Sequence, residues 1–441
     1  MANSYLQRTP SAGNRKTWTW SCWVKRSDIT NRQDFFSAGT ASNNTDTMAI
    51  RFDSGGTLTL AMYSSDIFQT TQLFRDPSAW YHIVVSMDTT QSTASDRVKL
   101  YVNGSQVTDF NSISYPSQNA DLGINGNVSH NIGRLEFNDS FYFDGYFTHV
   151  NFTDGTAYAA SDFGETNSTT GIWGPKVSPS VTYGTNGFFL KFENSGTLGT
   201  DSSGNGNNWS VSGSLLQGRS TPSNLFNTIN SVDCSANASQ IKVSATQLYA
   251  TGGGGDISTR GTLGINSGKW YWECKSIISA GHGNRKMVGF YDGISPVGNG
   301  RALSSYRGVL VDLQTGIVYK NGSTSGTTNI SSFSSGDIIG VFFDADNGEM
   351  RFSKNGNMEN SGNAVATGVD MSNYLYLPYI SQDGGGTNNG DMNCNFGEGY
   401  FATTAVSSGN ADANGYGQFE YNPVVSSTNY YALCTKNMEQ Y

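Results

Sequence analysis

Basic residues are scarce in this sequence, and they never gather into a cluster. Charged residues make up 14% of the 441 positions, the formal net charge is −9, and no basic run is longer than the pairs Lys25-Arg26 and Arg285-Lys286. A nucleic-acid-binding protein needs a basic stripe, because contacts with phosphates supply much of its binding free energy. We therefore predict that nucleic acid is not a partner.

Long apolar runs are missing as well. A helix that spans a membrane needs about 20 mostly apolar residues in a row, and no run in the chain approaches that length. The start of the chain, from Met1 to Arg8, lacks the charged and then apolar pattern of a signal peptide. The sequence therefore predicts no membrane insertion and a protein made in a cytoplasm without a cleaved export signal.

Cysteine and histidine are few and scattered. The cysteines are odd in number and lack zinc spacing, so we expect free thiols, most of them buried, instead of a disulfide framework. The histidines form no motif, and we predict neither a zinc site nor a catalytic residue among them. The residues in question are Cys22, Cys234, Cys274, Cys394 and Cys434, and His82, His130, His149 and His282.

Short strands joined by tight turns fill the chain instead. In residues 335–357, Ile339, Val341 and Phe343 share one side of an extended segment, a polar bend follows, and apolar and polar residues alternate on the return. Asn-Gly pairs after such alternating runs predict hairpins, because both residues accept the positive φ of the turn. The three pairs are Asn103-Gly104, Asn321-Gly322 and Asn355-Gly356.

Helical periodicity is almost absent, and two strand-rich regions are separated by a polar passage. We therefore predict an all-β chain of two antiparallel β-sandwich (jelly-roll) domains in tandem with a short C-terminal extension. The expected boundaries are 1–214 for the first sandwich, 215–235 for a linker, 236–402 for the second sandwich and 403–441 for a tyrosine-rich extension.

Five motifs of the first region follow one another in the order of a known fold, and this region resembles the laminin-G/concanavalin-like jelly roll. They are WSCWV at 20–24, WYHIVV at 80–85, VKLYVNG at 98–104, IGR at 132–134 and FDGYFTHV at 143–150. Residues 187–214 look like the strand and turn that usually open this fold, yet here they come last. They either close the same sandwich or bridge the two domains, and we favour closure because a strand needs a sheet to satisfy its backbone.

The second region resembles the SPRY domain. Its motifs are GKWYWE at 268–273, VGF at 288–290, GDIIGV at 336–341, PYI at 378–380 and NFG at 395–397. The tyrosine-rich end of the chain, 415–441, looks like the closing segment of structural proteins of tailed phages, especially marine ones, that join these same two folds. This resemblance implies a component of a virion.

Concanavalin-like folds include glucanases, which need two carboxylates at a fixed separation, normally on one strand. Their signature places an acidic residue two positions after a glutamate, and none of the nine glutamates here has one. We therefore predict a protein that is not an enzyme, and a glycan-cleaving depolymerase is only the third alternative.

Laminin-G-like modules often carry a calcium ion, so the resemblance raises calcium as an alternative to our expectation of no metal and no cofactor. Oxygen ligands would come from Asp201 and Asn205, or from Asp344 and Asp346. Neither set has EF-hand spacing, and each is also explained as a turn that uses Asp and Asn for local hydrogen bonds.

Surface recognition remains, because sandwich folds present loops whose aromatic side chains stack on sugar rings. The candidate ligand contacts are Trp173, Tyr291, Tyr306 and Tyr319, with packing as the competing interpretation. We predict a non-catalytic virion protein, an exposed fibre, knob or appendage that adheres to the host surface through carbohydrate. The alternative is a capsid or tail decoration protein that packs on other virion proteins and on copies of itself, for which the tyrosine-rich extension suits docking.

Overall fold

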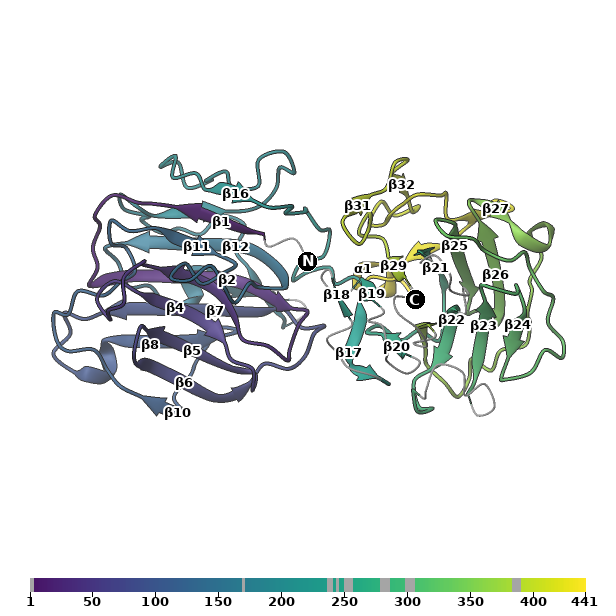
Figure 1. Ribbon diagram of the computed structural model, residues 1–441, viewed down its shortest axis with the longest axis horizontal. Coiled ribbons are helices and arrows are strands. Elements are labelled where there is room, and N and C mark those ends of the chain that lie inside the picture. Colours follow the sequence, from purple (N-terminus) through teal and green to yellow (C-terminus); the bar gives the residue numbers. More distant parts are fainter. Residues whose placement is uncertain are drawn as a thin grey trace. The chain divides into compact units, whose positions relative to one another are not determined.

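The computed structural model describes residues 4–168, 171–235, 241–242, 246–249, 257–277, 286–297, 306–382 and 390–441. The chain divides into two compact units, Met1–Gln217 and Gly218–Tyr441, and each packs two large sheets against one another (Figure 1). The predicted all-β class and the pair of antiparallel sandwiches are confirmed.

The first unit packs an eight-stranded sheet against a six-stranded one. Trp18, Trp20 and Cys22 share a face of β2, as their alternation predicts, and all three are fully buried in the core. The ring of Trp20 stacks on Phe36 of the facing sheet with centroids 3.9 Å apart. In order, the eight strands are β10 (Phe110–Ile113), β6 (Asp66–Leu73), β5 (Thr57–Met62), β4 (Met48–Phe52), β3 (Gln33–Ala38), β11 (His130–Ile132), β1 (Tyr5–Arg8) and β16 (Ser210–Ser212). The six are β15 (Phe188–Leu190), β12 (Gly145–Asp154), β2 (Thr17–Arg26), β7 (Tyr81–Asp88), β8 (Val98–Val102) and β9 (Ser105–Gln106).

Residues 187–214 close the first sandwich. β15 pairs with β12, and β16 pairs with β1, so both strands of this segment lie at sheet edges within the first unit. The interpretation favoured from the sequence is therefore confirmed. A short β13–β14 hairpin (Gly164–Thr166 and Trp173–Pro175) and the 3₁₀ turns η1 (Ala94–Asp96) and η2 (Ala160–Asp162) complete the unit.

The second unit has the same two-layer plan. Ile339, Val341 and Phe343 of β25 point into its core together, as expected, while Phe342 points to the other face. One sheet runs β17 (Ile229–Cys234), β20 (Ile257–Gly261), β28 (Tyr376–Gln382), β22 (Lys286–Asp292), β23 (Gly308–Asp312) and β24 (Val318–Lys320). The other runs β18 (Ile241–Lys242), β19 (Gln247–Tyr249), β29 (Asp391–Asn395), β21 (Lys269–Ser276), β25 (Ile338–Asp344), β26 (Glu349–Lys354) and β27 (Asn357–Met358).

The segment predicted as a linker belongs largely to the second unit. The division falls after Gln217, β17 pairs with β20 at a sheet edge, and Phe226 is buried. The polar segment 215–235 is therefore not a free linker. One edge strand and one buried phenylalanine attach it to the second sandwich.

The tyrosine-rich extension is likewise part of the second sandwich. Its strand β36 (Tyr431–Ala432) pairs in parallel with the first half of β21, and β29 pairs with the second half of β21. Tyr430 is almost fully buried, so its ring packs inside the unit instead of docking on another chain. The remaining elements are β30 (Tyr400–Phe401), β31 (Thr404–Ala405), β32 (Asn410–Ala411), β33 (Gln418–Phe419), β34 (Val424–Val425), β35 (Thr428–Asn429), α1 (Thr435–Met438) and, before them in the chain, the 3₁₀ turn η4 (Glu359–Gly362).

The three Asn-Gly pairs make the predicted reversals. Asn103 and Gly104 have φ values of 48° and 85° between β8 and β9, and Asn355 and Gly356 have 49° and 81° between β26 and β27. The third pair follows β24 with positive φ at both positions. The five cysteines are free thiols, and four of them are buried, also as predicted.

Candidate functional site

The outer face of the six-stranded sheet in the first unit is covered by the chain itself. Residues 158–168 and 171–181 contribute Tyr158, Phe163 and Trp173, which pack on Val84 of β7. We call the two segments 158–168 and 171–181 the covering arm. The candidate ligand contact Trp173 therefore lies within an apolar cluster on this face and is partly exposed.

Hydrogen bonds fix the covering arm to the sheet through His82. Trp173 donates its Nε1–H to Nδ1 of His82 over 3.1 Å, and Nε2 of His82 lies 2.9 Å from the Ser21 hydroxyl. Nδ1 accepts, so the imidazole proton lies on Nε2. Burial lowers the pKa of His82 to about 3, helped by His149, so the ring is neutral. His82 is thus a buried histidine with a polar partner at each ring nitrogen, whereas His282 lies outside the described residues.

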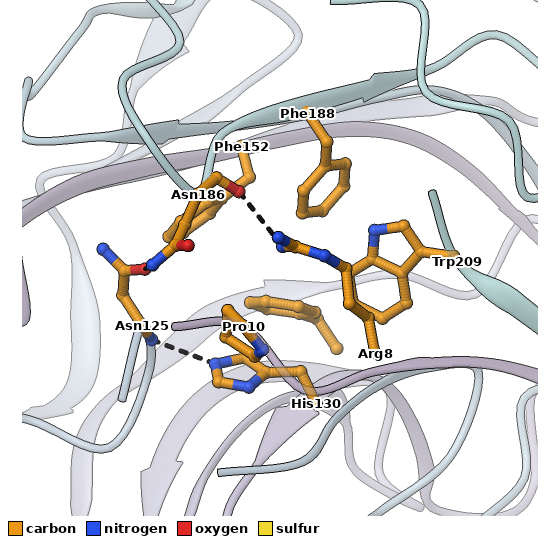
Figure 2. A pocket seen from close by; sticks show the side chains of 9 residues that line it. Arg8, Pro10, Asn125, His130, Phe152, Asn186, Phe188 and Trp209 are labelled. Carbon is orange, nitrogen blue, oxygen red and sulfur yellow. Dashed lines mark hydrogen bonds between the residues drawn. The ribbon is translucent and has the colours of Figure 1, made fainter. Parts of the chain in front are cut away.

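A small pocket opens between the two sheets of the first unit (Figure 2). Arg8 reaches past the indole of Trp209 and donates from Nη1 to the carbonyl of Asn186 over 3.3 Å. His130 accepts from the Asn125 amide over 3.0 Å, and burial lowers the pKa of His130 to about 4. The pocket has room for about one water molecule, so it suits an internal water and not a sugar ring.

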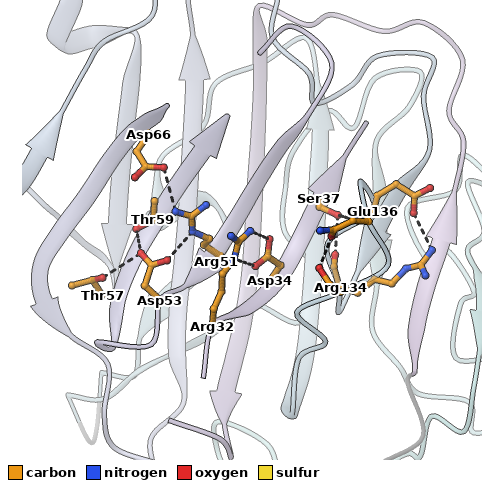
Figure 3. Close-up of polar contacts among 12 residues, drawn as sticks. Arg32, Asp34, Ser37, Arg51, Asp53, Thr57, Thr59, Asp66, Arg134 and Glu136 are labelled. Atoms are coloured by element: carbon orange, nitrogen blue, oxygen red, sulfur yellow. Dashed lines mark hydrogen bonds and ion pairs between the residues drawn. The ribbon is translucent and has the colours of Figure 1, made fainter. Parts of the chain in front are cut away.

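The outer face of the eight-stranded sheet is polar, and its polar residues lie opposite one another on neighbouring strands (Figure 3). Gln69 of β6 is paired with Thr59 of β5, Thr59 with Arg51 of β4, and Arg51 with Asp34 of β3. The apolar neighbours of these residues along each strand lie in the core, so the four side chains form one row on the opposite face across four strands. A second row crosses β3, β11 and β1 through Ser37, Asn131 and Gln7.

Charged side chains contact both rows. We call the whole set the polar belt, and its charged members are Arg32, Asp34, Arg51, Asp53, Asp66, Arg134, Glu136 and Asp139. Its neutral members are Gln7, Ser37, Thr57, Thr59, Gln69 and Asn131.

Arg51 is the centre of one half of the polar belt. Its Nε lies 2.8 Å from Asp53 and its Nη2 lies 3.3 Å from Asp66. Burial alone would raise the pKa of Asp53, but hydrogen bonds from Thr59 and Gln69 and the charge of Arg51 hold it below its usual value. Asp53 therefore stays ionised at neutral pH and presents a fixed acceptor.

Asp34 next to this centre is fully buried and is gripped by Arg32 through two bonds of 2.8 and 2.9 Å. Burial raises the pKa of Asp34, and the Arg32 guanidinium opposes that rise. A bidentate pair of this kind holds both planes in one orientation.

Glu136 is the centre of the other half. Its carboxylate accepts from Gln7, from Asn131 and from Arg134, the last over 3.0 Å, and its backbone N–H donates to Ser37 over 2.9 Å. The loop that carries Glu136 is therefore fastened to the outward row of β3, β11 and β1. Arg134 also contacts Asp139 over 2.6 Å.

Exposed aromatic rings flank the polar belt. Tyr63 is 45% exposed and meets Phe137 edge to face, with centroids 5.1 Å apart. Phe141 is 39% exposed and lies 4.0 Å from the Arg32 guanidinium. Exposed rings and planar polar groups together can bind a sugar. The rings stack on the apolar face of a pyranose, and the fixed donors and acceptors bind its hydroxyls.

Three of the predicted ligand contacts gather in the second unit. The ring of Tyr291 stacks on Tyr306 at 5.1 Å and on Tyr379 at 4.8 Å, with Arg260 beside it. Tyr291 and Tyr306 are only 5% and 3% exposed, and burial raises the pKa of Tyr291 to about 12. Tyr319 packs at the margin and is partly exposed. The rings of Tyr291 and Tyr306 stack face to face. Tyr319 is therefore the accessible member of the three.

The first set of calcium candidates is used by a turn. Asp201 accepts four hydrogen bonds at 2.8 to 2.9 Å, from Phe189, Asn207 and both donors of Ser203. Asn205 turns its amide nitrogen to two backbone carbonyls. The carboxylate oxygens are thus occupied by donors, and this set does not fit a calcium ion.

The second set of calcium candidates surrounds a lysine. Nζ of Lys269 lies 2.8 Å from Asp344 and 3.2 Å from Asp346, so an ammonium group takes the place between the two carboxylates that a cation would need. Asp344 also accepts from Asn347. Across the part of the chain that the structure describes, no three acidic, histidine or cysteine side chains gather as metal ligands would.

The polar belt was not predicted from the sequence. Its only local signal is the alternation of Arg51 and Thr59 with apolar neighbours in β4 and β5, which identifies an outward position but not its cross-strand partners. The loop residues Arg134 and Glu136 carry no such signal, because they reach the sheet through a turn.

The two units define an all-β protein made of two antiparallel sandwiches. Residues 1–161 match the Concanavalin A-like lectin/glucanases superfamily, and residues 269–390 match the SPRY domain. The chain therefore joins a concanavalin A-like domain to a SPRY domain, as its motifs predict, and domains of both kinds are typically non-catalytic binding domains. No curated protein matches the chain.

Solved structures resemble single domains of the chain. The SPRY domain of human HERC1 has 19% identity and a TM-score of 0.30, covering 38% of this chain and 96% of its own. The SAP-like pentraxin of Limulus polyphemus has 18% identity and a TM-score of 0.26, covering 35% and 71%. Domain 4 of the arabinanase AbnA from Geobacillus stearothermophilus, solved with arabinotriose, has 19% identity and a TM-score of 0.26, covering 34% and 66%. In the described residues, no helix has the length and apolar character needed to cross a membrane.

Proposed function

We propose that this chain is a non-catalytic carbohydrate-binding protein that holds its ligand on the polar belt of the first sandwich. The carrying observation is the in-register row of Gln69, Thr59, Arg51 and Asp34, together with the exposed ring of Phe141 over Arg32 and that of Tyr63 against Phe137. Gln69 and Arg51, the partly exposed members of the row, offer donors and acceptors for hydroxyls, and the rings offer stacking faces. Thr59 and Asp34 are fully buried and hold Asp53 and Arg32 in place. The outer face of the other sheet carries the covering arm, which favours the eight-stranded sheet as the binding face.

The carboxylates of the polar belt support binding without catalysis. Asp53, Asp66, Glu136 and Asp139 each contact an arginine, and the pKa of Asp53 is held below its usual value by Thr59, Gln69 and Arg51. A glycosidase acid needs the opposite, a carboxyl that keeps its proton near neutral pH. Burial does raise the pKa of Asp34, but this side chain is fully buried and held by Arg32, so it does not reach a ligand. Incubation with polysaccharides that the protein binds is expected to release no reducing sugar.

The setting that we propose for this binding is a tailed-phage particle, with the protein as an exposed fibre, knob or appendage that adheres to host-surface glycan. The resemblance of the closing segment to virion proteins supports this proposal. Antibody labelling of purified particles, followed by electron microscopy, is the test. Symmetric, saturating copy number without host binding would favour the decoration protein instead.

Replacing Tyr63 by alanine is expected to weaken glycan binding about fivefold, because one ring–sugar contact contributes on the order of 1 kcal/mol. Glycan-array screening of the full chain identifies a ligand, and titration calorimetry then compares the variants. Tyr115→Ala, which removes an exposed tyrosine beyond the edge strand β10, is the matched control and should bind as the unaltered chain does. Equal affinity for the Tyr63 variant and the control would place the ligand elsewhere.

A further inference from the structure

The arginines of the polar belt are all engaged by carboxylates. Arg32 is held by Asp34 over 2.8 Å, and Arg51 contacts both Asp53 and Asp66. In the other half, Arg134 contacts Glu136 and Asp139 over 3.0 and 2.6 Å. Three arginines thus face five carboxylates, which leaves the belt with an excess of two negative charges.

The two most exposed charges among the pairs of Arg51 and Arg134 are negative, whereas in the third pair Arg32 is 26% exposed beside the buried Asp34. The side chains of Asp139 and Asp66 are 69% and 36% exposed, whereas those of their partners Arg134 and Arg51 are 7% and 16% exposed. A ligand that approaches Arg51 or Arg134 therefore meets a carboxylate before it meets the guanidinium group. The whole chain adds to this field, since its net charge is −9.

We propose that the polar belt selects uncharged glycans and rejects anionic polysaccharides, whether sulfated or built from uronic acids. This inference rests on the proposed function of the same face. Hydroxyl groups donate to the paired carboxylates and accept from the paired arginines without breaking either pair. A sulfate or carboxylate on the ligand would instead meet Asp66 and Asp139, and it would have to displace them to reach Arg51 or Arg134.

The first test measures binding of the full chain to immobilised neutral and anionic polysaccharides at low and high ionic strength. Dextran, a β-glucan and a galactomannan are the neutral probes, and heparin and alginate are the anionic ones. We expect retention on at least one neutral polymer, unchanged by salt, and no retention on heparin or alginate even at low salt, where like-charge repulsion is strongest. Retention on an anionic polymer as strong as on the neutral ones would overturn the inference while leaving carbohydrate binding intact. Retention on none of these polymers, together with an empty glycan array, would instead remove the proposed function, and the inference with it.

The second test reverses the selection. The double variant Asp66→Asn/Asp139→Asn removes the two exposed carboxylates and leaves Nη2 of Arg51 and Nη1 of Arg134 without a charged partner, while Asp53 and Glu136 still hold the other side of each guanidinium. Its affinity for heparin is expected to rise at least tenfold and to fall with added salt. Asp96→Asn/Asp121→Asn changes the net charge equally at exposed positions outside the belt and should not raise heparin affinity. An equal rise in both double variants would show that overall charge, and not the belt, decides selection.

Discussion

Replacing Glu273 by alanine is expected to lower the free energy of unfolding of the second unit by about 4 kcal/mol at neutral pH. The carboxylate is fully buried and accepts from the Tyr271 hydroxyl and the Tyr421 amide at one oxygen, over 2.9 and 2.8 Å. At the other oxygen it accepts from Asn395 and from the Glu420 amide, over 3.1 and 3.0 Å. Alanine would leave these four donors without an acceptor in a dry interior.

Calorimetric unfolding of the full chain measures this loss, because each unit should give its own transition. Glu439→Ala removes a glutamate that is 63% exposed and paired with Lys436 three residues earlier, so it serves as the control with a change under about 0.5 kcal/mol. A loss below about 1 kcal/mol for the Glu273 variant would mean that water replaces the carboxylate.

The same group is expected to make the second unit less stable as pH rises. Burial raises the pKa of Glu273 to about 7, against the lowering effect of its donors. The folded unit therefore keeps this proton above the pH at which the unfolded chain loses it. The contribution is complete below about pH 4.5 and is lost as pH rises to about 7, for a total of about 3 kcal/mol. The Tyr271 hydroxyl can turn to accept from the protonated carboxyl, so the acid form keeps its network.

Denaturation of the full chain at pH 5 and pH 8 tests this dependence. Glu273→Gln cannot titrate, so the stability of its second unit should change less between the two pH values than that of the unaltered chain. Parallel pH profiles for the two proteins would contradict the assignment to Glu273.

Deleting residues 418–441 is expected to unfold the second unit while the first keeps its transition. The deleted segment supplies Phe419 and Tyr430, whose rings pack on Tyr271 and Phe342 with centroids 4.8 and 5.2 Å apart. It also carries both backbone amides that hold Glu273. The deletion would thus expose an apolar sheet face and strip a buried carboxylate of half its donors at the same time.

Phe419→Asp tests the same contact by one substitution. Phe419 is fully buried, and loss of such a ring costs about 3–5 kcal/mol before the charge is counted. Thr428→Asp adds the same charge at an exposed position of the same segment and should leave both transitions in place. A truncated chain that still melts in two transitions would show that 418–441 is an appendage after all.

These expectations give the terminal segment a structural role that its composition did not suggest. Tyr430 lies against Phe342 and accepts a hydrogen bond from Arg351 over 3.2 Å, so the tyrosine-rich end acts as a layer of its own sandwich. In this segment, Tyr441 is 50% exposed, so its ring remains accessible to a partner.

The sequence predicted the strands and several turns, because their causes are local. Alternation placed Trp18, Trp20 and Cys22 on one face of β2, and the Asn-Gly pairs placed hairpin turns through their tolerance of positive φ. The motifs of both domains are carried by such strands, which is why the tandem of two sandwiches was also predictable.

The candidate site was not predictable in the same way. Arg51, Asp53 and Asp66 become one ion network only when β4, β5 and β6 pair in a particular register, and Glu136 joins the sheet from a loop. Of the four predicted aromatic contacts, Tyr291 and Tyr306 are buried against one another, because an aromatic side chain in a strand is equally suited to packing and to exposure.

By itself, the sequence determined the fold class, the order of the two domains and the lack of a zinc or glycosidase signature, since each depends on residues close together in the chain. Tertiary structure decided which outward polar side chains gather in the polar belt and that the covering arm takes the opposite face. It also decided that the buried Glu273 accepts hydrogen bonds from the backbone amides of Glu420 and Tyr421, more than 140 positions away. The physical reason is that burial and hydrogen-bond partners are set by distant segments meeting, and period-two alternation carries no information about which segments meet.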